Sequence, residues 1–127
     1  MRRFVIAAAG LLAVCGCGGS EPGFRIDQVT ITPNDIPLNS TSNEEIRISA
    51  QVFSDRHEVI EVLVRSDEAF LWLDMIPGRY PRWSVTVPVS DFQGYPVGSY
   101  GLDIEARDDA ERTLRLDDAV RLKIRED

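Results

Sequence analysis

Few residues of this chain could take part in chemistry. Its 127 residues include one histidine and two cysteines, set among 21 acidic side chains. The histidine, His57, belongs to the segment Asp55-Arg56-His57, whose composition is typical of a turn between two strands. No Gly-x-Ser-x-Gly, phosphate-binding loop or His-Glu-x-x-His pattern occurs in the sequence. We interpret His57 as a solvent-facing turn residue and predict that the chain is not an enzyme and holds no cofactor.

Two carboxylates, Asp103 and Glu105, alternate with apolar residues and should share the outer face of one strand with Arg107. A pair of carboxylates can hydrolyse a glycosidic bond. The plainer interpretation is a solvated sheet face on which opposite charges pair across strands. The next strand offers three basic residues for such pairs, Arg121, Lys123 and Arg125.

Acidic residues also gather in two turn-like segments. Asp108, Asp109 and Glu111 lie in one, and Asp117 and Asp118 in the other. Oxygen-rich loops can bind calcium, but neither segment has the Asp-x-Asp-x-Asp-Gly order of a dedicated loop. Aspartate is also a common turn residue. We predict no metal site and keep calcium, held by the first segment, as an alternative.

The two cysteines, Cys15 and Cys17, lie two residues apart at the end of an apolar run. A disulfide between them would close a strained ring, and a metal would need ligands that one histidine cannot supply. Arg2 and Arg3 precede the run over residues 4–14, and small residues follow it. This order is typical of a secretory signal, and the run is too short for a membrane-spanning helix.

The sequence VCGC, from Val14 to Cys17, resembles the lipobox of bacterial lipoprotein signal peptides. The resemblance implies a signal peptide over 1–16 and fatty acids such as palmitate on Cys17, whereas Cys15 fits the pattern less well. Several acyl chains, each buried CH₂ adding about 0.8 kcal/mol, would anchor the protein stably. Gly18 occupies the position after the acylated cysteine, where the family places an aspartate for retention in the inner membrane. We therefore expect the protein to lie in the cell envelope, and in the outer membrane if the bacterium has two membranes.

The net charge limits the possible partners. The chain carries a formal charge of −7, and removal of Arg2 and Arg3 would make it −9. Such a domain should be repelled by nucleic acid and by anionic lipid. The segment 17–23 would be a flexible tether that reaches roughly 20 Å when extended. We predict a domain held close to the membrane by its lipid alone.

Residues 24–127 have the length of one domain, and their apolar residues recur with a period of two. Such alternation is typical of strands with one buried and one solvated face. Seven strands are predicted, over 24–32, 46–52, 60–65, 70–75, 83–89, 100–107 and 120–125. The alternation changes phase between Ile26 and Val29, which indicates a bulge or a switch of sheet. Short strands between regular turns predict an all-β, antiparallel two-sheet sandwich.

The segment GYPVGSYGLDIEARDDAERTLRL, residues 94–116, resembles strand F and the F–G turn of bacterial immunoglobulin-like domains. The resemblance implies a seven-stranded immunoglobulin-like sandwich and makes Tyr100 a tyrosine-corner residue, whose hydroxyl would bond upstream backbone. Leu102 occupies the place of a disulfide cysteine of antibody domains. The fold would therefore lack the intersheet disulfide.

Large apolar side chains suggest an interaction surface. Residues 70–75 are apolar on both faces, and one sandwich cannot bury both. One of two sets should therefore be partly exposed: Phe70 and Trp72, or Leu71, Leu73 and Met75. We expect Leu63 to extend the exposed patch. An exposed apolar patch is typical of a contact surface. The expected surface for a protein partner near the membrane comprises Leu63, Phe70, Leu71, Trp72 and Leu73.

Two other functions remain open. Exposed aromatic rings, from Trp72, Tyr80 or Tyr95, could instead bind carbohydrate of the cell wall. A short anchored module could also act only as a spacer. The sequence favours a membrane-anchored, non-catalytic binding or structural module over both enzyme and calcium-binding interpretations.

Overall fold

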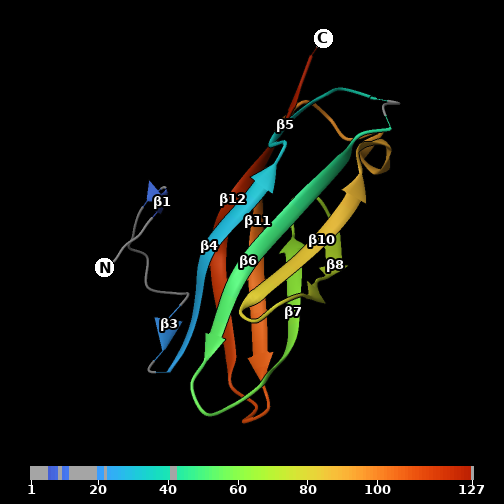
Figure 1. The fold of residues 1–127 in the computed structure, drawn as a ribbon. Coiled ribbons are helices and arrows are strands. Elements are labelled where there is room, and N and C mark those ends of the chain that lie inside the picture. The colour runs from blue at the N-terminus through green and yellow to red at the C-terminus, as the bar shows by residue number, and fades with distance from the viewer. Residues whose placement is uncertain (1–5, 9, 12–19, 22, 41–42, 127) are drawn as a thin grey trace.

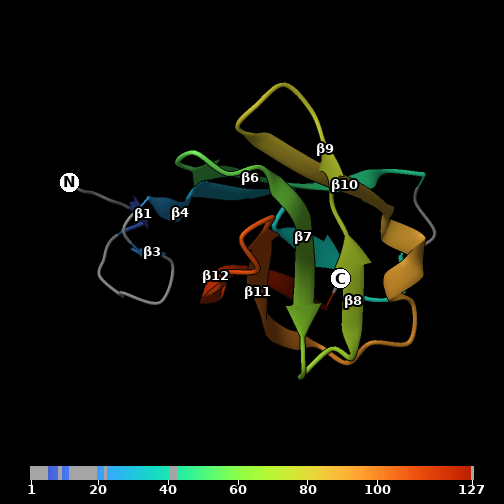
Figure 2. The same ribbon diagram turned by 90° about the horizontal axis from the view of Figure 1, so that it is seen from below.

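The computed structural model describes residues 6–8, 10–11, 20–21, 23–40 and 43–126, which are almost entirely strand and turn. Two five-stranded sheets pack face to face, as Figures 1 and 2 show. The first sheet has the spatial order β3 (Ser20–Glu21), β4 (Phe24–Thr32), β6 (Glu45–Ser54), β10 (Arg82–Pro88) and β9 (Ile76–Pro77). The second has the order β5 (Asp35–Pro37), β12 (Thr113–Arg125), β11 (Gly98–Asp108), β7 (Val59–Ser66) and β8 (Leu71–Asp74).

Three small elements complete the described structure. The strands β1 (Ile6–Ala8) and β2 (Gly10–Leu11) pair antiparallel with each other. A short 3₁₀ helix, η1 (Val89–Phe92), follows β10. No helix in the described ranges is both long and apolar enough to cross a bilayer. Cys15 and Cys17 of the predicted signal and lipidation site lie outside the described residues.

The prediction of an all-β chain with two sheets is confirmed, but seven strands is too few. Within the two five-stranded sheets, the alternation missed β3, β5 and β9, which are only two or three residues long. A period of two cannot be recognised in so short a segment. The strand β5 also runs parallel to β12, so the pairing is not antiparallel throughout.

The phase change in the first long strand is a bulge, as predicted. The register of β4 on β6 shifts between Asp27 and Thr30, and Gln28 adopts a positive φ of 50°. An extra residue in one strand reverses which side chains face the core. This explains why the apolar alternation of β4 begins on one phase and ends on the other.

The turn predicted at Asp117-Asp118 is wrong, because β12 continues through both residues. The register of β11 on β12 is irregular between Leu102 and Ile104, and Asp118 has a φ of 55°. The backbone N–H of Asp118 donates to the Asp103 carboxylate at 2.8 Å. Aspartate tolerates positive φ, which suits a bulge as well as a turn.

The core lies between the two sheets. Its most buried side chains come from both sheets and include Phe24, Ile46, Ile48, Val52, Val64, Leu102, Ile104, Leu122 and Ile124. Trp83 of β10 joins them with 7% exposure, as the alternation of β10 predicts. Fully burying one such side chain stabilises the fold by about 1.5–3 kcal/mol. None of these core strands contains a cysteine.

Tyr100 forms the hydrogen bond that the sequence predicts. Its hydroxyl donates to the backbone carbonyl of Pro96 at 2.6 Å. Its ring meets that of Tyr95 edge-on at 5.8 Å, and Tyr95 meets Phe92 in the same way at 5.2 Å. These contacts fasten the connection between β10 and β11 to the start of β11.

The order of the strands defines two ends of the domain. At the proximal end, defined as Gly23 with residues 55–58 and 109–112, β4 begins and two turns meet. The carbonyl of Gly23 accepts from Asp55 N–H at 2.6 Å, and Asp109 N–H donates to Glu58 at 2.8 Å. The distal end, defined as residues 67–70 and 89–97, holds the β7–β8 and β10–β11 connections at the other end of these strands (Figure 1).

Candidate functional site

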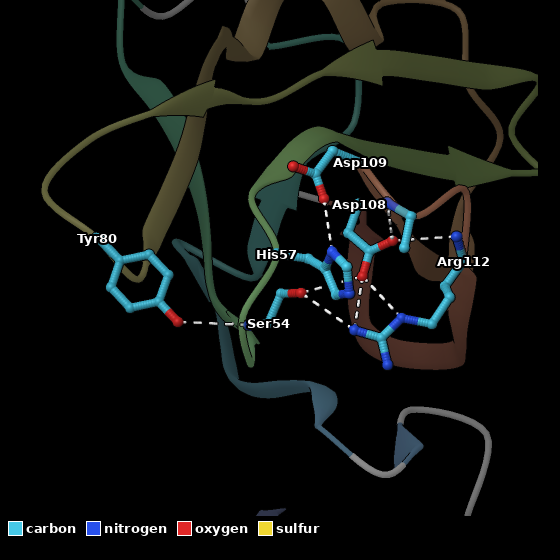
Figure 3. A network of polar contacts seen from close by, with 7 residues as sticks. Ser54, His57, Tyr80, Asp108, Asp109 and Arg112 are labelled. Carbon is cyan, nitrogen blue, oxygen red and sulfur yellow. Dashed lines mark hydrogen bonds and ion pairs between the residues drawn. The ribbon is translucent and has the colours of Figure 1, made fainter.

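A buried polar network lies at the proximal end and is centred on one carboxylate. Asp108, at the end of β11, is completely buried. Its Oδ1 accepts from the backbone N–H groups of Ala110 and Arg112 at 3.1 and 3.0 Å. Its Oδ2 accepts from Ser54 Oγ at 3.0 Å and from Arg112 Nε at 2.8 Å, and Arg112 Nη2 is 2.7 Å away (Figure 3). One carboxylate therefore joins β6, β11 and the turn before β12.

These contacts engage the Asp108 carboxylate that the calcium alternative would use as a ligand. A carboxylate has about four lone-pair sites, and five donors already surround Asp108. Asp109 is engaged separately with His57, and Glu111 sits at a positive φ of 63° on the exposed turn. The described part of the chain contains no group of three or more acidic, histidine or cysteine side chains placed to hold a metal ion.

The electrostatics of Asp108 follow from its partners. Burial alone raises the pKa of the Asp108 carboxyl, since it disfavours the charged form. The hydrogen bonds from the side chain and backbone of Arg112, the bond from Ser54 and the Arg112 charge outweigh this effect. The pKa of Asp108 therefore lies below its ordinary value of 3.8, and the carboxyl is ionised at neutral pH.

The arrangement does not form a nucleophile and base pair. His57 Nδ1 lies 3.0 Å from Asp109 Oδ1, and both side chains are nearly half exposed. Ser54, which is close in sequence, donates its hydroxyl proton to Asp108 rather than to His57. The hydroxyl of Ser54 also accepts from Arg112 Nη2 at 3.3 Å. The network holds three chain segments together, and sequence reasoning missed it because its members are distant in sequence.

The charged outer face of the second sheet is paired, as the sequence predicts. Glu105 bonds Arg65 of β7 at 2.9 Å, and Asp103 bonds Arg115 of β12 at 2.8 Å. The partners are thus Arg65 and Arg115, not the three basic residues at the end of β12 that the sequence suggested. Such paired carboxylates, each bonded to an arginine, give no sign of a glycosidase pair.

The structure settles which apolar side chains of the segment 70–75 are exposed. Phe70 is 94% exposed and Trp72 59%, whereas Met75 is buried. Leu71 and Leu73 lie partly buried against the core, on the inner face of β8. Phe70 and Trp72 are therefore the exposed pair.

The prediction that Leu63 extends this surface is wrong, because Leu63 is only 6% exposed. It occupies the outer face of β7 between Glu105 of β11 and Asp74 of β8. Trp72 and Arg65 line the depression above it, and the Arg65 guanidinium lies 4.7 Å from the centre of the Trp72 ring. Leu63 is on the outward-facing side of β7, but the long side chains of Trp72 and Arg65 cover it.

The exposed residues follow free edges of the sandwich. The strand β8 pairs only with β7 and is the edge of the second sheet, and β9 is the edge of the first. Ile76 of β9 is 66% exposed. We name Phe70 and Trp72, at the free edge of the second sheet, the edge surface. An edge strand presents unpaired backbone groups beside these side chains, which is the usual arrangement for strand addition or side-chain contact by a partner.

The aromatic residues proposed for carbohydrate binding do not form one platform. Tyr80 lies at the proximal end, edge-on to Phe53 with an interplanar angle of 86°. Tyr95 is part-buried, and its hydroxyl donates to the carbonyl of Ala69 at 2.8 Å. Trp72 stands apart, on β8. Sugar binding by these three rings together is not compatible with this arrangement.

Comparison with known proteins gives the fold and little else. No protein-family model matches the chain, and no curated protein matches it. The chain is similar to part of the X-ray structure of the endo-beta-1,4-mannanase from Thermotoga petrophila, with a TM-score of 0.52 and 11% identity. The match covers 79% of this chain and only 20% of that one. A crystal structure of an engineered protein matches at a TM-score of 0.46 and 14% identity, over 91% of this chain and 21% of the other.

Proposed function

We propose that this chain is a lipid-anchored, non-catalytic binding or structural module of the bacterial cell envelope. Its anchor is the acylated Cys17, and its globular part, residues 24–127, is an immunoglobulin-like sandwich. The order β4-β6-β10-β9 opposite β12-β11-β7 supports this fold, since it corresponds to strands A-B-E-D opposite G-F-C. The hydrogen bond of Tyr100 to the upstream carbonyl of Pro96 agrees with a tyrosine corner.

The edge surface is the observation that carries the binding role. Phe70 at 94% exposure and Trp72 at 59% are large apolar side chains two residues apart at one sheet edge, and grouped exposed apolar side chains are typical of a contact surface. The Trp72 ring is already held by Arg65, so a partner would meet a preorganised aromatic group. Aromatic and arginine side chains contribute most of the binding energy in many protein interfaces. The partner of this surface is a protein.

The binding role is tested by photo-crosslinking in living cells of the host bacterium. A photoreactive amino acid replaces Phe70 or Trp72, and as a control Lys123, which is exposed on the outer face of β12. We expect the first two positions to give an adduct of one discrete mass and Lys123 to give none. Replacing both Phe70 and Trp72 with alanine should weaken binding of the captured protein by about 1 kcal/mol or more per residue. Adducts of equal yield at all three positions, or none, would contradict the proposal.

A further inference from the structure

The outer face of the first sheet has a charge opposite to that of the whole chain. Arg25 of β4, Arg47 of β6 and Arg82 of β10 each alternate with buried residues and so point outward. Arg79 is exposed in the β9–β10 connection beside them. The acidic residues on this face are Asp27 of β4 and Glu45 of β6, the latter at the end of its strand. We name this surface, with the β9–β10 connection, the basic face.

The arginines of the basic face are available to anions. Arg47, Arg79 and Arg82 form no ion pair with any carboxylate of the described residues, and Arg25 pairs with Asp27 at 2.7 Å. The second sheet differs, since its outer arginines are taken up by carboxylates. The pairs there are Arg65–Glu105, Arg107–Glu61, Arg115–Asp103, Arg115–Asp117, Arg121–Asp118 and Arg125–Asp35. In the described part of the chain, five basic side chains form no ion pair, and three of them, Arg47, Arg79 and Arg82, belong to the basic face of a protein with a net charge of −7.

Aromatic side chains border these arginines at the proximal end. Tyr80 is 62% exposed. The Arg25 guanidinium lies 4.1 Å from the centre of the Phe53 ring, and the Tyr80 ring lies 6.1 Å from the same ring. Tyrosine beside arginine is the composition found at the interface between lipid and water.

The chain itself places this corner next to the predicted tether. Phe24, the first residue of β4, pairs with Ser54 of β6, and the Tyr80 hydroxyl accepts from the Ser54 N–H at 3.3 Å (Figure 3). The N–H of Val52 donates to the carbonyl of Pro81 at 2.9 Å. The β9–β10 connection therefore lies beside the strand that begins where the tether ends.

We propose that the basic face lies against the anionic phospholipid headgroups of the membrane that holds the lipid anchor. This inference rests on the proposed lipidation of Cys17, which brings the domain within reach of the bilayer. An end-on contact through the proximal end would instead press Asp55, Glu58 and Asp109 against anionic lipid. Contact through the basic face removes that repulsion, although the chain as a whole is acidic. It leaves the charged face of the second sheet toward solvent.

The orientation is tested with the full, processed lipoprotein reconstituted into vesicles. One set contains phosphatidylcholine alone, and the other contains phosphatidylcholine with phosphatidylglycerol. Single cysteines replace Tyr80, Glu58 or the distal Phe70 and carry a fluorophore, while the lipid headgroups carry a quencher. We expect quenching at Tyr80 to exceed that at the other two positions only in vesicles that contain phosphatidylglycerol, and added salt to reduce the difference.

Matched charge variants identify the residues responsible. We define the quenching preference as the ratio of quenching at Tyr80 to quenching at the other two positions. The double variant Arg79→Gln/Arg82→Gln should lower this ratio by on the order of fivefold per arginine removed. The control Arg56→Gln/Lys123→Gln removes the same charge from the proximal end and the second sheet, and should keep the preference. Equal quenching at all three positions, or the strongest quenching at Glu58, overturns the proposed orientation. Protein that does not float with either kind of vesicle overturns both the anchor and the orientation.

Discussion

Replacing Asp108 with alanine is expected to lower the free energy of unfolding by about 3–5 kcal/mol, because one partner of a buried ion pair is removed. Arg112, whose side chain is 30% exposed, would lose its carboxylate, and Ser54 and two backbone N–H groups would lose their acceptor. The three segments joined at the proximal end would then separate more easily. Urea denaturation followed by the fluorescence of buried Trp83 measures the change.

Asp109 provides the matched control for this variant. It is the neighbouring residue, and its ion pair with His57 is exposed on both sides. Exposed pairs contribute about 0–1 kcal/mol, so Asp109→Ala should change stability little. Losses of equal size for Asp108→Ala and Asp109→Ala would show that the buried network is not what stabilises this end.

The same carboxyl should make the stability depend on pH in the acidic range. The pKa of Asp108 is lower in the folded state than its ordinary value of 3.8, so the unfolded chain binds this proton more tightly. The stabilisation of the fold by ionised Asp108 is complete when the pH is above that ordinary value. It is lost as the pH falls through the lower pKa of the folded state. Asp108→Asn lacks this contribution, so its stability should fall less than that of the native protein between about pH 5 and pH 2. Parallel pH profiles for the two proteins would contradict this assignment.

Replacing Cys17 with serine is expected to move the protein from the membrane fraction to the soluble fraction of the cell envelope, or to leave it unprocessed. The serine hydroxyl cannot form the thioether that carries the diacylglycerol. Each buried CH₂ of an acyl chain contributes about 0.8 kcal/mol, so the loss of several chains removes the anchor altogether. Fractionation of the host bacterium, together with incorporation of labelled palmitate, measures both consequences.

Cys15 is the control for this prediction because it lies two residues away. Cys15→Ser should leave both palmitate incorporation and membrane retention intact, since Cys15 would belong to the removed signal peptide. If Cys15→Ser releases the protein and Cys17→Ser does not, the modified cysteine has been assigned to the wrong position. If neither variant changes the fractionation, lipidation is not the anchor.

The alternation of apolar residues was sufficient to predict the long strands and the two-sheet arrangement. It also located the bulge near Gln28, because a change of phase is itself visible in the sequence. Strands of two or three residues, such as β5 and β9, contain too few positions to show a period. The residues Asp117 and Asp118 suit both a turn and a bulge, and only the pairing of β12 with β11 decides between them.

The sites were less predictable than the strands because their geometry depends on distant residues. Residues 70–75 could be identified as partly exposed, since one sandwich cannot bury both faces. Leu63 was misplaced because the neighbours that cover it, Trp72 and Arg65, belong to a cross-strand arrangement that spacing does not reveal. The network of Asp108 spans 54 residues from Ser54 and gave no local signal beyond a polar turn.

The positions of the two ends determine how this domain would bear a mechanical load. The strand β4 begins at the proximal end, and Phe70 belongs to the β7–β8 connection at the distal end. A pull between the tether and a partner at Phe70 would therefore run along β4. The hydrogen bonds that join antiparallel strands lie across the strand direction, so such a pull shears several bonds of β4 on β6 together. The bulge at Gln28 divides this ladder, and the segment Phe24–Asp27 would carry the load first.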